Sequence, residues 1–146
     1  SPVHFPKQAA TMGVLCDPKH PALSNFPTEM HSDWQWWDLN TNSVTLSLDS
    51  IPKVTPIVEM VDNWINNRRL ALVFEAKCGT GKLLYTSIDL NSNIENRPQA
   101  KQLLFSLIKY MNSSEFAPKE SLNFEVLKQF ERDRVFDKKE TPTDIY

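Results

Sequence analysis

Glycine and cysteine are both scarce in this chain of 146 residues, which holds three glycines and two cysteines. The two cysteines, Cys16 and Cys78, are too few for the disulfide framework that stabilises many small secreted domains. With so few glycines, Gly79 and Gly81 mark a place where the backbone needs a tight turn. A single domain of this length buries about 70% of the surface of its unfolded chain, so we expect an ordinary apolar core.

Long apolar runs and blocks of one charge are also missing. No apolar stretch approaches the roughly 20 residues that a membrane-spanning helix needs. The 16 basic and 18 acidic residues are interspersed, so the sequence shows no basic patch for nucleic acid or for an anionic membrane surface. We therefore expect neither nucleic acid nor a membrane among the partners.

The stretch from Arg69 to Leu90, RLALVFEAKCGTGKLLYTSIDL, is the feature around which we expect the fold to be organised. Its first half, Leu70 to Phe74, is almost unbroken apolar sequence, which is typical of a strand covered on both faces. Its second half, Lys82 to Leu90, is rich in Leu, Tyr, Thr and Ile. The glycines between the halves predict a β-hairpin, with both strands inside a sheet and not at its edge.

Shorter strands and one irregular segment are predicted on the N-terminal side of this hairpin. Residues 11–16, 43–48 and 57–61 are short and apolar, or alternate apolar with small polar residues, as half-buried strands do. Three prolines within residues 17–28 limit that segment to an ordered loop with at most one helical turn.

Two helices are predicted on the C-terminal side. Pro98 suits the first turn of a helix that ends near Met111. At a spacing of 3.6 residues, one face of this helix carries Ala100, Leu103, Leu104, Leu107, Ile108 and Met111. A second helix over residues 122–132 is expected to be capped by Ser121. Its inward side chains are expected to be Phe124, Leu127 and Phe130 (or Val126).

These elements predict an α/β fold with a mixed sheet, a central antiparallel hairpin and flanking helices. We place the α/β domain at residues 1–116 and a C-terminal helix with a charged tail at residues 117–146.

Gly79-Thr80-Gly81-Lys82 has some features of a phosphate-binding loop. The Walker pattern needs a glycine where this chain has Ala76, and Ser or Thr where it has Leu83. The loop also leads into a strand, so it offers no helix N-terminus to a phosphate. We interpret it as a hairpin turn.

A nucleophilic cysteine is the next catalytic hypothesis. Such a residue needs a helix start or a basic partner to lower its pKa. Cys16 precedes Asp17 and Pro18, which provide neither, and Cys78 lies in a turn. His20 and His31 are polar enough to act as bases, but no triad spacing is visible. The three histidines form no recognisable metal-ligand set either, so we expect no catalytic residue, no metal and no cofactor.

Glu75 directly follows the apolar run, and strict alternation would place it on the face opposite Leu72 and Phe74. A carboxylate beside a sheet core has a raised pKa unless it is paired. We expect a structural ion pair with Lys77 or Arg69. A role in a functional site is the alternative.

Three of the four tryptophans lie within four positions. Rings of this size fill cores more often than they bind ligands, so we favour packing. The alternative is a sugar platform, in which the rings stack on sugar C–H faces while neighbouring polar groups bind hydroxyls. Alternation would place Trp34 and Trp36 on one side and Trp37 on the other. The candidates for carbohydrate contact are Trp34, Trp36, Trp37, Asp33, Gln35 and His31.

Three stretches together carry a family resemblance: CDPKHPALSNFPTEMHSDWQWW at residues 16–37, RLALVFEAKCGTGKLLYTSIDL at 69–90 and RPQAKQLLFSLIKYM at 97–111. They resemble the accessory domain of multidomain bacterial proteins of glycoside hydrolase family 2, which are β-galactosidase-like. That domain is similar to the class I glutamine-amidotransferase fold, a flavodoxin-like α/β sheet. The resemblance covers most of residues 12–116, and it is most specific at His20-Pro21, Phe26-Pro27 and the tryptophans.

The resemblance implies a non-catalytic accessory module that serves domain packing, assembly or glycan contact in a periplasmic or secreted hydrolase. The implied partners are other domains of the same parent chain, glycan and a second copy of the chain. Neither cysteine sits in the Gly-x-Cys-x-Gly elbow of the amidotransferases, and no acidic residue matches the hydrolase acid and nucleophile.

Two further expectations accompany the resemblance. The chain opens on Ser1-Pro2 without an initiator methionine, so we expect it to be a piece of a longer protein. The resemblance implies that the first βα units of the domain lie upstream of Ser1. The sheet edge left by their absence would favour self-association, or would be covered by residues 1–11 or by the tail after Glu115. The alternative is a complete small fold without such an edge. The alternatives are an amidotransferase-like hydrolase using Cys16 or Cys78 with His20 or His31, and a sugar-binding module using the tryptophans.

Overall fold

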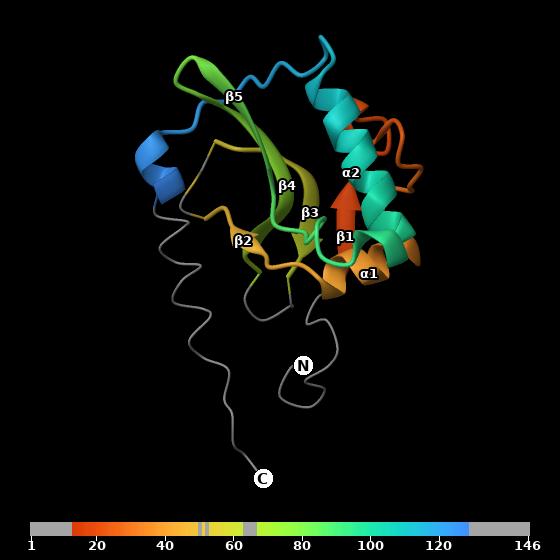
Figure 1. Cartoon of the computed structure of the whole chain (residues 1–146). Coiled ribbons are helices and arrows are strands. Elements are labelled where there is room, and N and C mark those ends of the chain that lie inside the picture. The colour runs from red at the N-terminus through yellow and green to blue at the C-terminus, as the bar shows by residue number, and fades with distance from the viewer. Residues whose placement is uncertain (1–12, 50, 52, 63–66, 129–146) are drawn as a thin grey trace.

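The computed structural model describes residues 13–49, 51, 53–62 and 67–128 (Figure 1). In chain order it contains β1 (Gly13–Cys16), the short 3-10 helix η1 (Pro21–Leu23), α1 (Gln35–Thr41), β2 (Leu46–Ser47), β3 (Pro56–Val61), β4 (Arg69–Cys78), β5 (Gly81–Thr86), η2 (Ile94–Asn96) and α2 (Pro98–Met111). Residues 124–128 are also helical. The α/β content that the sequence predicts is therefore confirmed.

Strand β4 is the centre of the sheet. It pairs with β3 along one edge and with β2 and β5 along the other, and β1 extends the sheet beyond β3. All of these pairings are antiparallel, and in the described part of the chain a parallel pairing occurs at the isolated bridge between Lys77 and Ser121. The expected mixed sheet is thus antiparallel between its named strands.

The predicted hairpin is confirmed as β4 and β5. Cys78 lies opposite Gly81, and Gly79 has a φ of 60°, in the left-handed region that favours glycine. The buried run from Leu70 to Phe74 confirms that β4 lies inside the sheet. The same prediction for β5 was wrong. Within the described residues β5 pairs with β4 alone, and its side chains are half-buried or exposed because it lies at the edge.

Two compensating bulges shift the faces of the central strands. Ala71 lies opposite Glu59 and Val73 lies opposite Val58, so Leu72 is an extra residue in β4. One step further along, Ile57 is an extra residue in β3, because Phe74 lies opposite Pro56. A one-residue shift moves every following side chain to the other face.

The bulge in β4 also corrects the prediction for Glu75. Leu72 and Val73, neighbours in sequence, both pack into the same apolar cluster, whereas Phe74 packs into the other. Glu75 therefore lies on the side of Leu72, where it reaches Tyr110 of α2. Strict alternation predicts Glu75 correctly relative to Phe74 and wrongly relative to Leu72.

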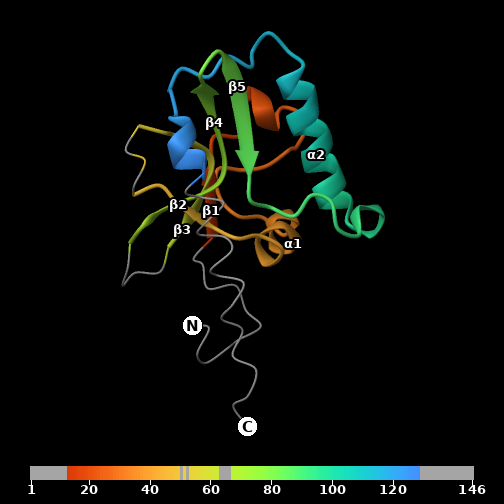
Figure 2. The ribbon, with the colours of Figure 1, turned by 60° about the vertical axis from the view of Figure 1, so that its left-hand side comes forward.

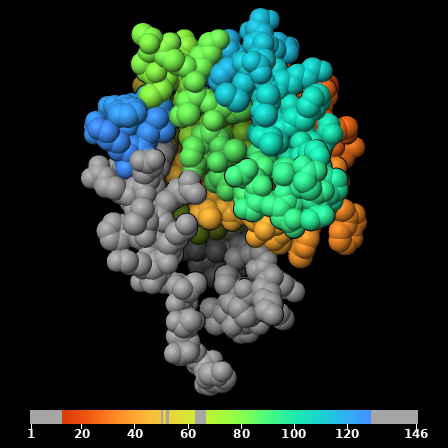
Figure 3. Space-filling model, in the orientation of Figure 1, coloured from red at the N-terminus to blue at the C-terminus, as the bar shows by residue number. Residues whose placement is uncertain are grey.

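The sheet separates two apolar clusters. The larger one lies between the sheet and a layer of η1, α1 and α2, and its bulkiest fully buried side chains are Trp36, Leu23, Leu39, Leu72, Leu103 and Val58. The smaller one lies on the opposite face under residues 122–127, and its buried members are Leu48, Ile51, Val54, Ala71, Phe74, Ala76 and Leu122. Figures 2 and 3 show the hairpin between α2 on one side and the C-terminal helical segment on the other.

The first predicted helix forms as α2, and residues 124–128 of the second are helical, while its predicted residues 129–132 lie outside the described residues. Each helix faces its neighbours differently from expectation. In α2 the buried side chains are Ala100, Leu103, Ser106, Leu107 and Tyr110. Ile108 and Met111 are instead 49% and 46% exposed. The face turns because η1 packs on α2: the Ser106 hydroxyl donates to the carbonyl oxygen of Ala22 at 2.7 Å.

The second helix differs from expectation at its start. The side chain of Asn123, not that of Ser121, accepts the hydrogen bond from the Glu125 amide, because Ser121 is held beside Lys77. Phe124 is exposed, whereas Val126 and Leu127 pack on the smaller cluster. Phe130 lies outside the described residues.

Of the remaining strands, β3 (Pro56–Val61) confirms the strand predicted at residues 57–61, whereas β2 is shorter than predicted. Of residues 43–48, Leu46 and Ser47 form β2, and Ser43 forms an isolated bridge with Ile88. Residues 13–16 form β1, while residues 11 and 12 lie outside the described range. The proline-rich loop contains the single turn η1, as expected.

Candidate ligand-contact sites

In and beside helix α1, one of the three clustered tryptophans is buried in the core and the other two lie on the surface. Trp34 occupies the N-cap position, and Trp37 follows one turn later on the same side. Trp34 is 92% exposed and Trp37 is 57% exposed, whereas Trp36 is fully buried. The alternating placement predicted from the sequence was wrong, because the segment is helical and positions three apart share a face. We call Trp34 and Trp37 the tryptophan surface.

Trp36 fixes this surface to the core. Its ring meets Phe26 edge to face at a centroid distance of 5.2 Å. Its indole Nε1 donates to the Thr28 hydroxyl at 2.8 Å, so the polar atom of the buried ring is satisfied. The packing interpretation therefore holds for Trp36, which presents no free face to a sugar.

The polar side chains near the tryptophans are engaged with the backbone. Asp33 accepts a hydrogen bond from the Glu29 amide, and Gln35 donates to the carbonyl oxygen of Pro27 at 2.6 Å. His31 is exposed, with Nδ1 at 3.4 Å from the carbonyl oxygen of Ser32. These residues shape the loop before α1, so a ligand here would contact mainly the rings.

Arg97 joins α1 to α2 at a buried corner. Its Nε donates to Asp38 of α1 at 2.8 Å, and its Nη1 donates to the carbonyl oxygens of Asp89 and Ser92. The Asp89 carboxylate in turn accepts from the backbone amides of Ser92 and Asn91. These hydrogen bonds, that of Ser92 first, lower the pKa of Asp89 to about 2. The corner thus fixes α1 and its tryptophan surface relative to α2.

The cysteines and histidines do not form a nucleophile and base. The Cys16 thiol donates to the carbonyl oxygen of Glu29 at 3.3 Å, and burial raises its pKa. Cys78 ends β4 at the hairpin turn. Within the described part of the chain, neither cysteine is hydrogen-bonded to His20 or His31.

No group of three or more His, Cys, Asp or Glu side chains among the described residues is arranged to hold a metal ion. No helix in the described ranges is long and apolar enough to cross a membrane.

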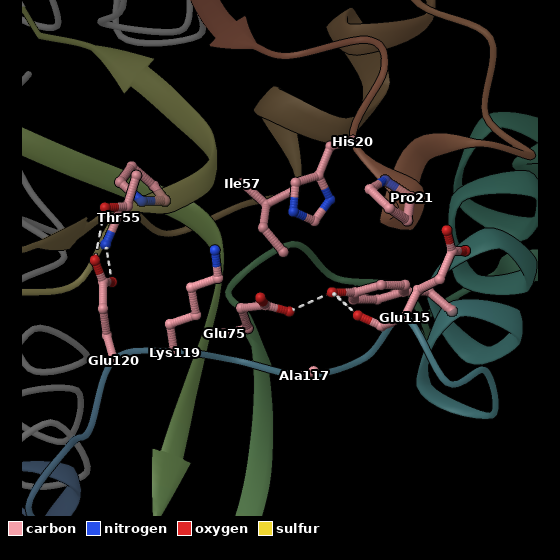
Figure 4. A pocket seen from close by; sticks show the side chains of 11 residues that line it. His20, Pro21, Thr55, Ile57, Glu75, Glu115, Ala117, Lys119 and Glu120 are labelled. Atoms are coloured by element: carbon pink, nitrogen blue, oxygen red, sulfur yellow. Dashed lines mark hydrogen bonds between the residues drawn. The ribbon is translucent and has the colours of Figure 1, made fainter.

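A pocket of about 430 Å³ opens between η1, β3, β4, the end of α2 and residues 115–120 (Figure 4). Its volume is within the range of small-molecule sites, about 300–1,000 Å³. The lining residues are His20, Pro21, Thr55, Pro56, Ile57, Glu75, Tyr110, Glu115, Ala117, Lys119 and Glu120.

Glu75 and Tyr110 form the floor of this pocket. The Tyr110 hydroxyl donates to Glu75 Oε2 at 2.7 Å. Burial, followed by the charge and hydrogen bond of Glu75, raises the pKa of Tyr110 above its usual value, so the phenol keeps the proton that it donates. The ion pair expected for Glu75 is absent from the described residues: Arg69 donates instead to the carbonyl oxygen of Val54, and Lys77 is exposed.

His20 contributes a fixed imidazole to the pocket. Its Nδ1 accepts a hydrogen bond from the Ala22 amide at 3.2 Å, which caps η1. The neutral ring must therefore carry its proton on Nε2. Its edge packs against Tyr110 at a centroid distance of 5.6 Å. Figure 4 shows the ring pointing into the pocket above Glu75.

Sequence reasoning identified Glu75 and His20 but not the set to which they belong. One sequence feature could have pointed to Tyr110: it lies on the buried face of α2 and carries a hydroxyl group there. Ile57 enters through a bulge, and Lys119 comes from an irregular segment, so neither has a periodic signature.

Comparison with known proteins gives one assignment. No curated protein matches the sequence. The profile of one family matches residues 1–132, which is most of the chain. The chain therefore belongs to the family described as Domain of unknown function (DUF8487).

Proposed function

We propose that this chain is a non-catalytic accessory module of a β-galactosidase-like enzyme of glycoside hydrolase family 2, and that it contacts glycan through the tryptophan surface. The proposal starts from the resemblance of residues 16–37, 69–90 and 97–111. These stretches contribute η1, the first turn of α1, the β4–β5 hairpin and α2, which pack around the larger apolar cluster. The residues that carry the resemblance therefore support one packed unit.

The single observation that carries glycan contact is the exposure of Trp34 and Trp37 on a fixed helix. Two indoles held one turn apart offer flat apolar faces to sugar C–H groups. Trp36 and the Asp38–Arg97 ion pair hold the backbone beneath them, so little conformational entropy is lost on binding.

The non-catalytic part of the proposal is supported by the state of the cysteines. A thiol whose pKa is raised by burial is a weak nucleophile at neutral pH, as for Cys16. We expect the chain to hydrolyse neither aryl glycosides nor glutamine. Turnover that is lost in Cys16→Ala or Cys78→Ala would contradict this and favour the amidotransferase-like alternative.

The flavodoxin-like, amidotransferase-like fold is part of the same proposal. It is supported by the α/β content and by the helical layer over one face of the sheet. Because all of the named strands pair antiparallel, the parallel sheet of such a fold would have to be formed by other strands of the parent protein, which an experimental structure of that protein would test. Assembly with a second copy also remains in the proposal, supported by the edge position of β5, and light scattering measures it.

The test of glycan contact is retention on immobilised oligosaccharide and polysaccharide. We expect Trp34→Ala and Trp37→Ala each to weaken binding about fivefold, which corresponds to about 1 kcal/mol of aromatic contact. Phe105→Ala is the matched control, because this exposed aromatic residue lies on α2. Equal binding by all three variants would overturn glycan contact and favour a role of the rings in packing against a neighbouring domain.

A further inference from the structure

The pocket beside η1 has hydrogen-bonding capacity that the protein leaves unused. Glu75 uses Oε2 to accept from Tyr110, and His20 uses Nδ1 to accept from Ala22. Among the described residues, Glu75 Oε1, His20 Nε2 and Lys119 Nζ have no hydrogen-bond or ion-pair partner, and none of them is a buried unsatisfied atom. Figure 4 shows these three side chains converging on one space. One acceptor and two donors are thus available to a ligand.

Two of these groups, the Glu75 carboxylate and the His20 imidazole, are held in position before any ligand arrives. The bulge at Leu72 turns Glu75 toward α2, and the Tyr110 hydroxyl then holds one carboxylate oxygen. Bulges commonly redirect a side chain next to a binding site. The Ala22 amide holds the imidazole of His20 in one orientation. A ligand would therefore meet a preformed arrangement, which lowers the entropic cost of binding.

The outer wall, residues 115–122, is also tied to the sheet. The Lys77 amide donates to the Glu120 carbonyl oxygen at 2.7 Å, and the Leu122 amide donates back to the Lys77 carbonyl oxygen at 2.8 Å. Lys82 Nζ donates to the carbonyl oxygen of Phe116 at 2.6 Å. The Glu120 side chain accepts from both the amide and the hydroxyl of Thr55. This wall forms a fixed side of the pocket.

The charges select the class of ligand. Three carboxylates, those of Glu75, Glu115 and Glu120, line the pocket and disfavour an anion. The ammonium group of Lys119 offsets part of this negative charge, and hydrogen bonds from Thr55 already occupy both carboxylate oxygens of Glu120. A hydroxyl group both donates and accepts, so neighbouring hydroxyls suit a carboxylate flanked by N–H donors. Ile57 and Pro21 supply apolar wall for C–H groups.

We propose that this pocket is a binding site for a small, neutral, polyhydroxylated molecule about the size of one sugar ring. Glu75 accepts hydrogen bonds from its hydroxyls, while His20 Nε2 and Lys119 Nζ donate to them. No residue of α1 lines the pocket, so this site is separate from the tryptophan surface.

The test is NMR titration of the full chain with galactose, glucose and mannose, followed in amide spectra. We expect saturable shifts in residues that line the pocket. Glu75→Gln removes the charged acceptor at nearly unchanged size and should weaken binding about tenfold. Lys119→Ala, at an exposed position, should weaken it several-fold without affecting folding. Glu125→Gln, a surface carboxylate outside the pocket, is the matched control and should change nothing.

Each outcome decides for or against the site. If Glu75→Gln does not fold, Lys119→Ala alone tests the proposal. The absence of saturable shifts with all three sugars would overturn it, as would equal binding by the pocket variants and the control. Binding of glucuronate or inorganic phosphate that is lost in Lys119→Ala but kept in Glu75→Gln would identify an anion site instead. Trp34→Ala and Trp37→Ala should leave these shifts unchanged, so glycan contact at α1 succeeds or fails independently.

Discussion

The tryptophan surface on α1 and the pocket at Glu75 differ in where their hydrogen bonds go. Around the tryptophans, the side chains of Asp33 and Gln35 are hydrogen-bonded to backbone groups, and the exposed groups are mainly the indole rings. In the pocket, one polar atom of Glu75 and one of His20 form a hydrogen bond that orients the side chain, and the second polar atom of each is available to a ligand. The first surface is suited to stacking and the second to hydrogen bonding.

The difference shows why exposure alone is a poor guide to a site. Trp34 is the more conspicuous residue, but its surroundings offer few free polar groups. Glu75 is half-buried and looked from the sequence like half of an ion pair. What distinguishes it is a partner, Tyr110, that orients the carboxylate without neutralising it. Variants of the residues that hold each surface in place test this contrast.

The largest effect is expected from removing the anchor of the tryptophan surface. Trp36→Ala deletes a fully buried ring and leaves a cavity, which should lower the free energy of unfolding by about 3–5 kcal/mol. Trp34→Ala, at an exposed position, should change it by less than about 0.5 kcal/mol. Urea denaturation of both variants measures the difference. Similar losses in the two proteins would contradict the division into anchor and surface.

The next effect concerns the corner that joins α1 to α2. Arg97→Gln breaks charged hydrogen bonds to Asp38, Asp89 and Ser92, so the free energy of unfolding should fall by about 2–3 kcal/mol. Lys101→Gln removes the cation of the exposed pair between Lys101 of α2 and Glu95 of η2, and should cost less than about 1 kcal/mol. If Arg97→Gln and Lys101→Gln lower the free energy of unfolding equally, the hydrogen bonds of Arg97 do not hold α1 against α2.

In the pocket, Tyr110→Phe tests whether the hydroxyl holds Glu75. At neutral pH it should lower the free energy of unfolding by about 1 kcal/mol. Because the pKa of Tyr110 is raised in the folded protein, its contribution is complete below the unfolded value of about 10 and is lost as the pH rises through the folded pKa. The difference in the free energy of unfolding between wild type and Tyr110→Phe should therefore become smaller above a pH of about 10. Urea denaturation at neutral and alkaline pH measures it, with Tyr85→Phe on β5 as the control. A gap that does not depend on pH would argue against the Tyr110–Glu75 bond.

The parts of the fold that sequence predicted correctly are those with strong local signals. The unbroken apolar run correctly predicted β4, Gly79 correctly predicted the hairpin turn, and Pro98 correctly predicted the start of α2. Each depends on a property of a few neighbouring residues. Placement in the sheet was harder, because the edge position of β5 depends on which other strands exist and not on its own composition.

The candidate site was predicted only in pieces, for a related reason. Its geometry depends on a register shift at Leu72 and on Tyr110, 35 residues further along the chain than Glu75. Neither a bulge nor a contact over that distance leaves a periodic pattern. The tryptophans were misplaced because three bulky residues in four positions suit a strand and a helix almost equally well, and the helix was decided by tertiary packing of Trp36 and Leu39.

The smallest effect is expected at Asp89, below the corner that holds Arg97. Its folded pKa of about 2 is lower than the unfolded value of about 3.8 because backbone amides of Ser92 and Asn91 bind the ionised carboxylate. A depressed pKa gives stability that is complete above the unfolded value and is lost as the pH falls through the folded value. Wild type should therefore lose stability between pH of about 4 and about 2, and Asp89→Asn, which has no charge to protonate there, should lose less over the same interval. Thermal denaturation at several acid pH values measures both slopes. The asparagine variant should be slightly less stable at neutral pH and should approach wild type as the solution becomes acidic. Parallel curves for the two proteins would mean that the Asp89 turn adds nothing to the corner, and that Arg97 is held by Asp38 and the backbone carbonyl oxygens alone.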